Sequence, residues 1–428
     1  MRFCTLTLGC KVNQYETQSL EAILTARGYI EVQAGQGCDV CVINTCAVTV
    51  ESVRKSAQAV RRIKKLEPEA IIVVCGCLPK LEPEKITDLG ADIIAEPGEK
   101  QALADEIETL LKSDLPTQIQ IEHFYAEDTQ VDNAGTHGGR TRALLKIQDG
   151  CDNFCAYCVI PYARGRVKSE LIGNIADEAR RLKSAGFLEI VVTGIEIASY
   201  GKDLAGGETL TDAVRAIGDA APGVRLRLGS IDPGIVTERF CAELSANVNI
   251  CNHFHLSLQS GCDETLRRMN RKYDTAAVSA AIARLRHYFP DCGITADLIT
   301  GFPGETDDEF AQTLEFIRAA KFSDMHIFPF SPRQGTTAFD MPGGVSKSVR
   351  RERAQKAARI AGRNALKFKL SQIGKTADVL FERERDGCWC GHAANYLEIR
   401  VPNGGNRNTI HPVQITGVEN GVIWGEII

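Results

Sequence analysis

The chain has 428 residues, 44% of them apolar, and a formal net charge of −5, which corresponds to about three domains with a core in each. Its longest strongly apolar run, residues 70–75, is far shorter than the roughly 20 residues of a membrane span, and the chain does not open on a basic segment followed by an apolar one. We therefore expect a soluble cytoplasmic protein with no membrane partner.

The cysteine content indicates the redox state of the thiols, and the placement of charge bears on nucleic-acid binding. Sixteen cysteines in a chain of this length indicate reduced thiols and metal sites rather than the disulfides of a small secreted protein. The negative net charge argues against a general nucleic-acid binder, but basic side chains gather at residues 54–65 and 350–369. Such runs are usually solvated helix faces.

Residues 1–112 alternate short apolar runs with amphipathic stretches, which predicts a parallel α/β domain. The expected strands are residues 3–8, 40–44, 71–74 and 93–94. Cys10, Cys46 and Cys77 follow the first three strands, so we expect them at one sheet edge, where open α/β folds bind ligands. A metal site is favoured over three buried cysteines because this placement repeats. Cys75 is expected to point into the core instead.

Residues 113–140 are rich in Pro, Thr, Gln, Asp and Gly, and we expect them to form a linker. Residues 141–368 then contain six strand-like segments, most of them followed by a helical stretch. These segments are residues 143–147, 188–193, 225–228, 253–258, 294–299 and 325–328. The pattern predicts a partial (β/α)6 barrel whose chemistry lies at the carboxyl ends of its strands.

A C-x3-C-x2-C loop follows the first of these strands and contains Cys151, Cys155 and Cys158. Three thiolates on a cluster of four irons leave one iron without a protein ligand, whereas structural zinc takes four ligands. The spacing is similar to that of radical S-adenosylmethionine (SAM) enzymes. That similarity implies an open iron that binds SAM and cleaves it, after one-electron reduction, to a 5′-deoxyadenosyl radical.

Seven residues in this unit are candidates for contact with SAM: Phe154, Tyr157, Glu196, Ser230, Gln259, Asp297 and Gly301. The two aromatic side chains would shield the cluster and stack near the adenine. Glu196 would accept from the SAM amino group, and Ser230 and Gln259 would contact the ribose and the carboxylate. The glycine-rich loop at 297–304 would let backbone approach the adenine. Ordinary core packing for the aromatics and a solvent-facing glutamate are the plain structural alternatives.

The chain ends in a predicted helix at 350–369 and a tail, residues 369–428, with four β-type segments. These segments are residues 376–381, 396–401, 411–418 and 422–428. We expect a small OB-like barrel, a fold that commonly binds oligonucleotides. Because the tail is slightly acidic, we place more of the phosphate contact on the basic stretches. Cys388 and Cys390 flank Trp389 and are expected in a surface turn.

Two cysteine triplets in two domains, followed by such a barrel, resemble the methylthiotransferase family of radical SAM enzymes over essentially the whole chain. The motifs that carry the resemblance lie at residues 7–16, 44–49, 76–77, 151–158, 255–261, 301–306 and 330–336. The resemblance implies a second 4Fe-4S cluster on Cys10, Cys46 and Cys77, whose open iron carries the sulfur to be donated. It also implies two SAM molecules per turnover and a carboxy-terminal TRAM domain.

The motif at residues 8–16 looks like the branch of the family that modifies N6-threonylcarbamoyladenosine next to the tRNA anticodon. This implies methylthiolation at carbon 2 of the adenine at position 37. The implied partners are the tRNA anticodon stem-loop, a sulfur donor and a one-electron donor such as flavodoxin. Isopentenyladenosine in tRNA or a ribosomal-protein aspartate is the alternative substrate. A more distant alternative is a non-catalytic iron–sulfur module that binds RNA.

Overall fold

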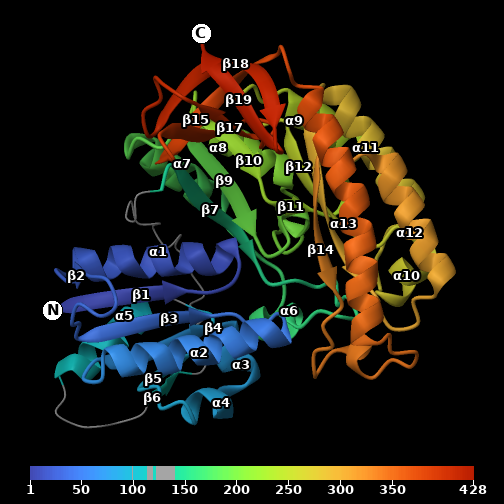
Figure 1. Ribbon diagram of the computed structural model, residues 1–428. Coiled ribbons are helices and arrows are strands. Elements are labelled where there is room, and N and C mark those ends of the chain that lie inside the picture. The colour runs from blue at the N-terminus through green and yellow to red at the C-terminus, as the bar shows by residue number, and fades with distance from the viewer. Residues whose placement is uncertain (99, 113–118, 122–139) are drawn as a thin grey trace.

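The computed structural model (Figure 1) describes residues 1–98, 100–112, 119–121 and 140–428. Most of the predicted linker lies outside these residues. The described part contains two parallel α/β assemblies and a closed β-barrel, as the sequence predicts. Among the described residues, none of the helices has the length and apolar character that a membrane crossing requires.

The amino-terminal assembly is a six-stranded parallel sheet with helices on both faces. Its strands, in spatial order, are β2 (Ile30–Glu31), β1 (Arg2–Thr7), β3 (Val40–Thr45), β4 (Ile71–Gly76), β5 (Ile93–Ala95) and β6 (Ile119–Ile121). The apolar faces of α1 (Lys11–Ala26) and α5 (Lys100–Lys112) cover one side of the sheet. The other side is covered by α2 (Val50–Leu66), α3 (Cys77–Leu81) and α4 (Pro83–Thr87).

The second assembly is a partial barrel of two four-stranded sheets. One sheet has the order β10 (Arg225–Leu228), β9 (Glu189–Gly194), β7 (Arg142–Asp149), β8 (Lys168–Ser169). The other has the order β11 (Ser230–Ile231), β12 (His253–Gln259), β13 (Gly293–Thr300), β14 (Asp324–Pro329). The six predicted barrel strands are therefore confirmed, with only β8 antiparallel among these eight strands.

Helices pack on the outer side of the partial barrel and, with its strands, bury the largest core in the described structure. Two further elements lie outside this core: α6 (Ile160–Arg164), which contacts α3, and η3 (Thr337–Phe339). The elements that contribute to the core are, in chain order, α7 (Ile172–Ser184), η1 (Ile197–Ser199), α8 (Leu210–Ala220), η2 (Pro233–Ile235), α9 (Glu238–Ser245), α10 (Asp263–Arg268), α11 (Thr275–Tyr288), α12 (Asp307–Ala320) and α13 (Lys347–Leu370). The last of these is the predicted basic helix, and it packs along β14 and α12.

The carboxy-terminal barrel closes in the order β15 (Thr376–Arg385), β16 (Cys388–Ala393), β17 (Glu398–Val401), β19 (Val422–Ile427), β18 (Thr409–Glu419). The predicted surface turn at Cys388 and Cys390 is wrong, because both residues lie in β16. Cys390 is buried there. Strand β16 also contains Gly391, where a Cβ would lie 2.3 Å from the carbonyl oxygen of Leu380, so this close strand contact requires glycine.

The carboxy-terminal barrel closes the amino end of the partial barrel. Arg227 of β10 donates to the carbonyl oxygens of Ala393 (3.2 Å) and Ala394 (2.9 Å). Tyr396 stacks on His253 with ring centroids 4.6 Å apart, and the Arg227 guanidinium lies 4.8 Å from the same ring. This arrangement leaves the opposite, carboxyl end of the strands for the site.

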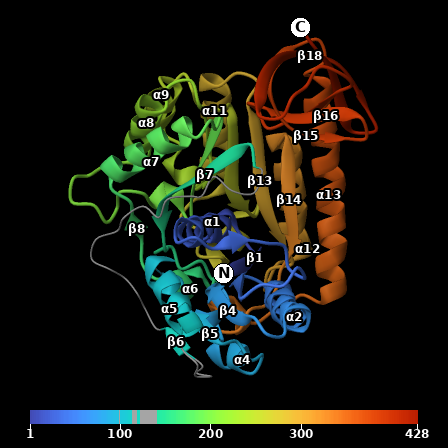
Figure 2. The same ribbon diagram turned by 90° about the vertical axis from the view of Figure 1, so that its left-hand side faces the viewer.

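Helix α1 lies between the amino-terminal sheet and the partial barrel (Figures 1 and 2) and contacts β7 and β9. Tyr15 of α1 forms a small buried cluster with Leu144 and Val191. A second contact comes from Arg333, which donates to the carbonyl oxygen of Ala47 (3.0 Å) and pairs with Glu82 (2.6 Å). The two α/β assemblies therefore share a packed interface.

Candidate active site

The amino-terminal triplet occupies the carboxyl ends of three strands, as predicted. Cys10 precedes α1, Cys46 follows β3, and Cys77 opens α3. A Cβ on Gly9 would lie 3.3 Å from Cys46 Sγ, and the Cys10 and Cys77 thiols interact electrostatically. Burial raises the pKa of Cys77 to about 11. The loops therefore bring these thiols to one edge of the sheet.

Glycine is required at the residue before Cys77. Gly76 has a φ of +94°, and a Cβ there would lie 2.4 Å from Asn44 Oδ1. The preceding Cys75 is buried in the core beneath α1 and α5, as expected, whereas Cys77 packs on the opposite side of the sheet. The positive φ of glycine thus turns the chain so that only the second of these two cysteines reaches the site.

The second triplet lies in the loop between β7 and α6. The N–H of Cys158 donates to the carbonyl of Cys155 at 2.9 Å, which folds the loop back on itself. The N–H of Ala156 donates to the carbonyl of Met269 at 2.9 Å and ties the loop to the end of α10. Burial raises the pKa of Cys158 to about 12, and Cys158 interacts electrostatically with both Cys151 and Cys155.

Arg271 supports this loop from the side. Its guanidinium lies 3.0 Å from Cys155 Sγ, 2.9 Å from Asp232 Oδ2 and 2.8 Å from the Tyr273 hydroxyl. The arginine therefore holds the sulfur of Cys155 in a fixed position within the loop. Three closely spaced thiols with a fixed arginine beside them fit a 4Fe-4S cluster held by three protein ligands.

Arg164 connects the two triplets and is fully enclosed by protein. Its guanidinium donates to Asn13 Oδ1 (2.9 Å), to both oxygens of Glu16 (2.8 and 3.1 Å) and to Asp149 (3.0 Å). Asn13 and Glu16 belong to α1, whereas Asp149 and Arg164 flank the second cysteine loop. Arg164 also interacts electrostatically with Cys10 and Cys77. One charged side chain therefore fixes the two loops relative to each other.

Two of the residues predicted to contact SAM lie beside the second triplet. Tyr157 makes an edge contact with Phe302, with centroids 6.4 Å apart, and interacts electrostatically with Arg271. Glu196, after β9, interacts electrostatically with Cys151. Burial, with a contribution from nearby Asp232, raises the pKa of Glu196 to about 7. Both side chains therefore lie close to cysteines of the second triplet.

The remaining candidates are more dispersed. Phe154, with a φ of +46°, packs edge-on against Tyr162 and is largely exposed. Ser230 is exposed at the start of β11, and Gln259 ends β12 with a φ of +65°. The space beside Gly301 is filled by Arg350, whose Cγ lies 2.2 Å from the position of a Cβ. That glycine therefore has a packing role whether or not adenine binds there.

Asp297 lies on β13 between two histidines. Its carboxylate contacts His255 Nε2 at 3.1 Å and His326 Nδ1 at 3.2 Å, and His255 Nδ1 contacts the hydroxyl of Thr295 at 2.8 Å. Burial opposes ionisation, but hydrogen bonds from the two imidazoles lower the pKa of Asp297 well below its usual range. The arrangement places two imidazoles and a carboxylate together in the middle of the neighbouring strands β12, β13 and β14.

Two arginines at the site were missed by sequence reasoning. Arg164 follows the cysteine loop by six residues, and its partners Asn13 and Glu16 lie about 150 residues earlier in the chain. Arg271 reaches Cys155 from a distant turn. Only the closeness of Arg164 to the cysteine motif in the sequence was a usable signal.

The prediction that the basic stretch 350–369 contacts phosphate is wrong for two of its members. Arg353 is buried and pairs with Glu305 (2.7 Å) and Asp307 (2.8 Å). Arg350 donates to the carbonyl oxygen of Phe330. Arg353 therefore attaches α13 to the loop after β13, and Arg350 attaches it to the loop after β14. The exposed cations of the helix are Lys347, Arg351, Lys356, Arg359, Arg363 and Lys367.

Family models and relatives of known proteins match both α/β assemblies of the chain. Residues 145–317 match the Radical SAM superfamily, and residues 2–95 match Uncharacterized protein family UPF0004. A Thermotoga maritima protein named threonylcarbamoyladenosine tRNA methylthiotransferase MtaB is 35% identical over 97% of this chain and 95% of its own length. A Pelotomaculum thermopropionicum protein named tRNA-2-methylthio-N(6)-dimethylallyladenosine synthase is 30% identical over 90% of this chain and 87% of its own length.

A solved structure is also similar. The radical S-adenosylmethionine methyltransferase TsrM from Kitasatospora setae is 14% identical, with a TM-score of 0.58 over 79% of this chain and 75% of that chain. At this identity the likeness concerns the fold alone.

Proposed function

The chain belongs to the radical SAM tRNA methylthiotransferases, the family of the MtaB enzymes, and on that premise we propose that it methylthiolates N6-threonylcarbamoyladenosine in tRNA. The reaction would place the group on carbon 2 of the adenine at position 37, giving 2-methylthio-N6-threonylcarbamoyladenosine. The observation that carries the proposal is that Arg164, six residues after the second triplet, interacts electrostatically with Cys10 and Cys77 of the first. A methylthio transfer needs one site that holds sulfur and another that generates a radical, and here the two would be neighbours.

The family uses SAM and a 4Fe-4S cluster. We assign that cluster to Cys151, Cys155 and Cys158, and a second, sulfur-carrying cluster to Cys10, Cys46 and Cys77. When bound, these clusters and two SAM molecules per turnover supply the methylation and radical chemistry that an unactivated ring C–H requires. Among the residues predicted to contact SAM, the placement of Tyr157 and Glu196 beside the second triplet supports their assignment most directly.

The chain's own residues hold and orient the reacting groups. Arg271 contacts Cys155 Sγ and pairs with Asp232, which fixes the loop that carries the second triplet. Arg164 fixes the separation between the two loops, on which a transfer from one to the other depends. The closed amino end of the partial barrel, with Tyr396 stacked on His253, limits entry of water and substrate to the opposite end.

The position of Lys11 supports a substrate adenine that carries a threonylcarbamoyl group rather than an isopentenyl group. It follows Cys10 directly, and its ammonium interacts electrostatically with the rings of Tyr396, His253 and His326, which line the partial barrel. Among the described residues, no carboxylate forms an ion pair with Lys11. A threonylcarbamoyl group ends in a carboxylate that could pair with this cation, whereas an isopentenyl group is wholly apolar.

The partners would be the anticodon stem-loop of tRNA, a sulfur donor, and a one-electron donor of the flavodoxin class. Exposed cations on α13 are suited to tRNA phosphates. The electron donor would have to reduce the cluster on the second triplet, where Cys155 and Cys158 are only partly buried.

Mass spectrometry of tRNA nucleosides tests the proposal. tRNA from a deletion strain would be compared with tRNA from the same strain carrying the wild-type chain or Cys77→Ala. We expect the methylthio mass increment on threonylcarbamoyladenosine with the wild-type chain alone. An increment on isopentenyladenosine, or on a ribosomal-protein aspartate, would overturn the substrate. Absence of 5′-deoxyadenosine when purified protein is given SAM and reductant would overturn the chemistry.

A further inference from the structure

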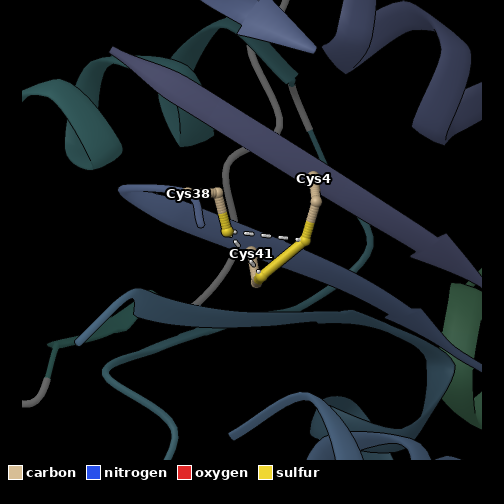
Figure 3. A group of neighbouring side chains, drawn as sticks. All are labelled: Cys4, Cys38 and Cys41. Carbon is tan, nitrogen blue, oxygen red and sulfur yellow. Dashed lines mark hydrogen bonds between the residues drawn. A yellow bond between two sulfur atoms is a disulfide. The ribbon is translucent and has the colours of Figure 1, made fainter. Parts of the chain in front are cut away.

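Three cysteines outside both triplets meet in the amino-terminal sheet (Figure 3). Cys4 lies in β1, Cys41 in β3, and Cys38 just before β3. The structure joins Cys4 and Cys41 as a disulfide, although the sequence predicted reduced thiols. Cys38 Sγ lies 3.2 Å from Cys41 Sγ and 3.8 Å from Cys4 Sγ. All three sulfur atoms lie within 4.8 Å of one another.

The backbone holds these sulfurs together independently of the disulfide. Cys4 and Cys41 are register partners in a parallel ladder, and their Cα atoms are 4.8 Å apart, which is the ordinary spacing of neighbouring strands. Glu67 organises the loop that carries Cys38, because its carboxylate accepts the N–H groups of Gly35 (2.6 Å), Gly37 (3.1 Å) and Cys38 (3.3 Å). Reduction would therefore leave three thiols close together.

The reduced form is the one expected in a working enzyme. The proposed function requires a strong one-electron reductant, and disulfides are rare where thiols are kept reduced. Reduction by a dithiol breaks the Cys4–Cys41 bond, takes up two electrons and two protons, and converts the dithiol to its own disulfide. The site then presents three thiols in place of one.

We propose that reduced Cys4, Cys38 and Cys41 bind one soft metal ion of the zinc class. Thiolates bound to tetrahedral zinc at about 2.3 Å lie about 3.8 Å apart. The sulfurs of Cys38 and Cys4 already have this separation, at 3.8 Å, and the sulfur of Cys41, 3.2 Å from that of Cys38, would move slightly away once the disulfide is reduced. Each thiol loses its proton on binding. The carboxylate of Glu67 or solvent at half-buried Cys38 supplies an oxygen as fourth ligand.

This site differs from both triplets in place and in purpose. Cys4 and Cys41 lie within the strands, and Cys38 precedes its strand, whereas Cys10, Cys46 and Cys77 follow the carboxyl ends. The metal ion would tie β1 to the loop before β3 on the side of the sheet covered by α2. We therefore assign it a structural role, separate from the chemistry at the clusters.

Metal analysis of the fully reconstituted protein tests the proposal. The wild-type chain would be purified anaerobically with a dithiol, loaded with both clusters, given one equivalent of zinc chloride and desalted. We expect about one zinc per chain beside about eight irons. Cys38→Ser should lower the zinc content about tenfold and leave the iron unchanged. Cys388→Ser, which removes a half-buried cysteine of the carboxy-terminal barrel, should keep the zinc.

Cysteine labelling of the wild-type chain provides a second measurement that needs no variant. Zinc should protect Cys4, Cys38 and Cys41 from iodoacetamide, as read by peptide mass spectrometry. Equal labelling with and without zinc would overturn the proposal, as would full zinc content in Cys38→Ser. A Cys4–Cys41 disulfide that survives the dithiol would overturn it too. Iron counts report separately on the clusters, so failure of this site is distinguishable from failure of the proposed function.

Discussion

Lys11 is set apart from the other cations of the site by its surroundings. Arg164 and Arg271 are each matched by carboxylates, and both hold the loops that carry the cysteines. Lys11 instead interacts electrostatically with Tyr396, Glu189 and His326, and no ion pair of Lys11 is found in the part of the chain that the structure describes. A charge placed this way contributes little to folding, so its value lies in recognising an anionic group.

Replacing Lys11 by glutamine tests that role. We expect Lys11→Gln to lower kcat/KM on tRNA that contains threonylcarbamoyladenosine by about tenfold, the loss expected for one charge-assisted hydrogen bond. Lys11→Arg should retain most of the activity. Steady-state kinetics on purified tRNA would measure both, with iron content as the control. An unchanged kcat/KM in the glutamine variant would show that the substrate carboxylate pairs elsewhere.

Helix α13 illustrates how one element can combine two roles. Its inner side anchors the loop after β13 through Arg353 and the loop after β14 through Arg350. Its exposed side carries Arg359, Arg363 and Lys367 at successive spacings of four residues. Like charges at this spacing repel one another across a helical turn. This row of like charges destabilises the helix, but it is suited to binding a polyanion such as tRNA.

Charge reversal on the exposed side separates these roles. We expect Arg359→Glu with Arg363→Glu to weaken tRNA binding and to reduce the slope of log affinity against log salt by about 1.5, because about two phosphate contacts are lost. The matched control is the double variant Arg180→Glu with Lys183→Glu, at two exposed positions of α7. Fluorescence anisotropy at several salt concentrations would measure the slope. Equal effects of the two double variants would rule out a specific contact by α13.

The sequence was sufficient to predict the helices and strands whose apolar residues recur at a regular spacing, and to predict the two cysteine sites. The longer strands of both α/β assemblies were predicted because parallel buried strands are continuous apolar runs. Edge strands β2 and β6 were missed because strands of two or three residues are too short to show a repeating apolar pattern. The Cys-Trp-Cys-Gly run of β16 was read as a turn, since a glycine required by close strand packing looks like a breaker. Arg164 and its partners could not be predicted, because their contacts span about 150 residues.

At the scale of the whole molecule, the carboxy-terminal barrel is also a structural part of the partial barrel. Arg225 and Arg227 both donate to its carbonyl groups while pairing with Glu189, which is fully buried. The ion pairs and Tyr396 together seal one end of the partial barrel. Loss of any of these groups would leave buried charge without a partner.

Glu189→Gln tests this seal. Burial opposes ionisation, but Arg227 and Arg225 lower the pKa of Glu189 to about 2. The stabilisation is therefore complete above the ordinary carboxyl pKa of about 4.5 and is lost only as pH falls toward 2. We expect Glu189→Gln to lower the free energy of unfolding by about 3 kcal/mol relative to the wild-type chain. The difference should be the same at pH 6 and pH 8.

Denaturant unfolding at the two pH values would measure this difference. Glu264→Gln, which removes an exposed partner of Arg267, is the control and should change stability little. A gap between wild type and Glu189→Gln that closes at pH 6 would mean that Glu189 titrates near neutrality, contrary to expectation.

The contacts of Arg164 limit how such a protein can be recombined. The arginine follows β7 of the partial barrel, whereas Asn13 and Glu16 come from the first helix of the amino-terminal assembly. A chimaera that joined the amino-terminal assembly of this chain to the partial barrel of a distant relative would bury either a cation or a carboxylate without its counterpart. The two assemblies are therefore expected to be inherited together, as a matched pair rather than as interchangeable modules.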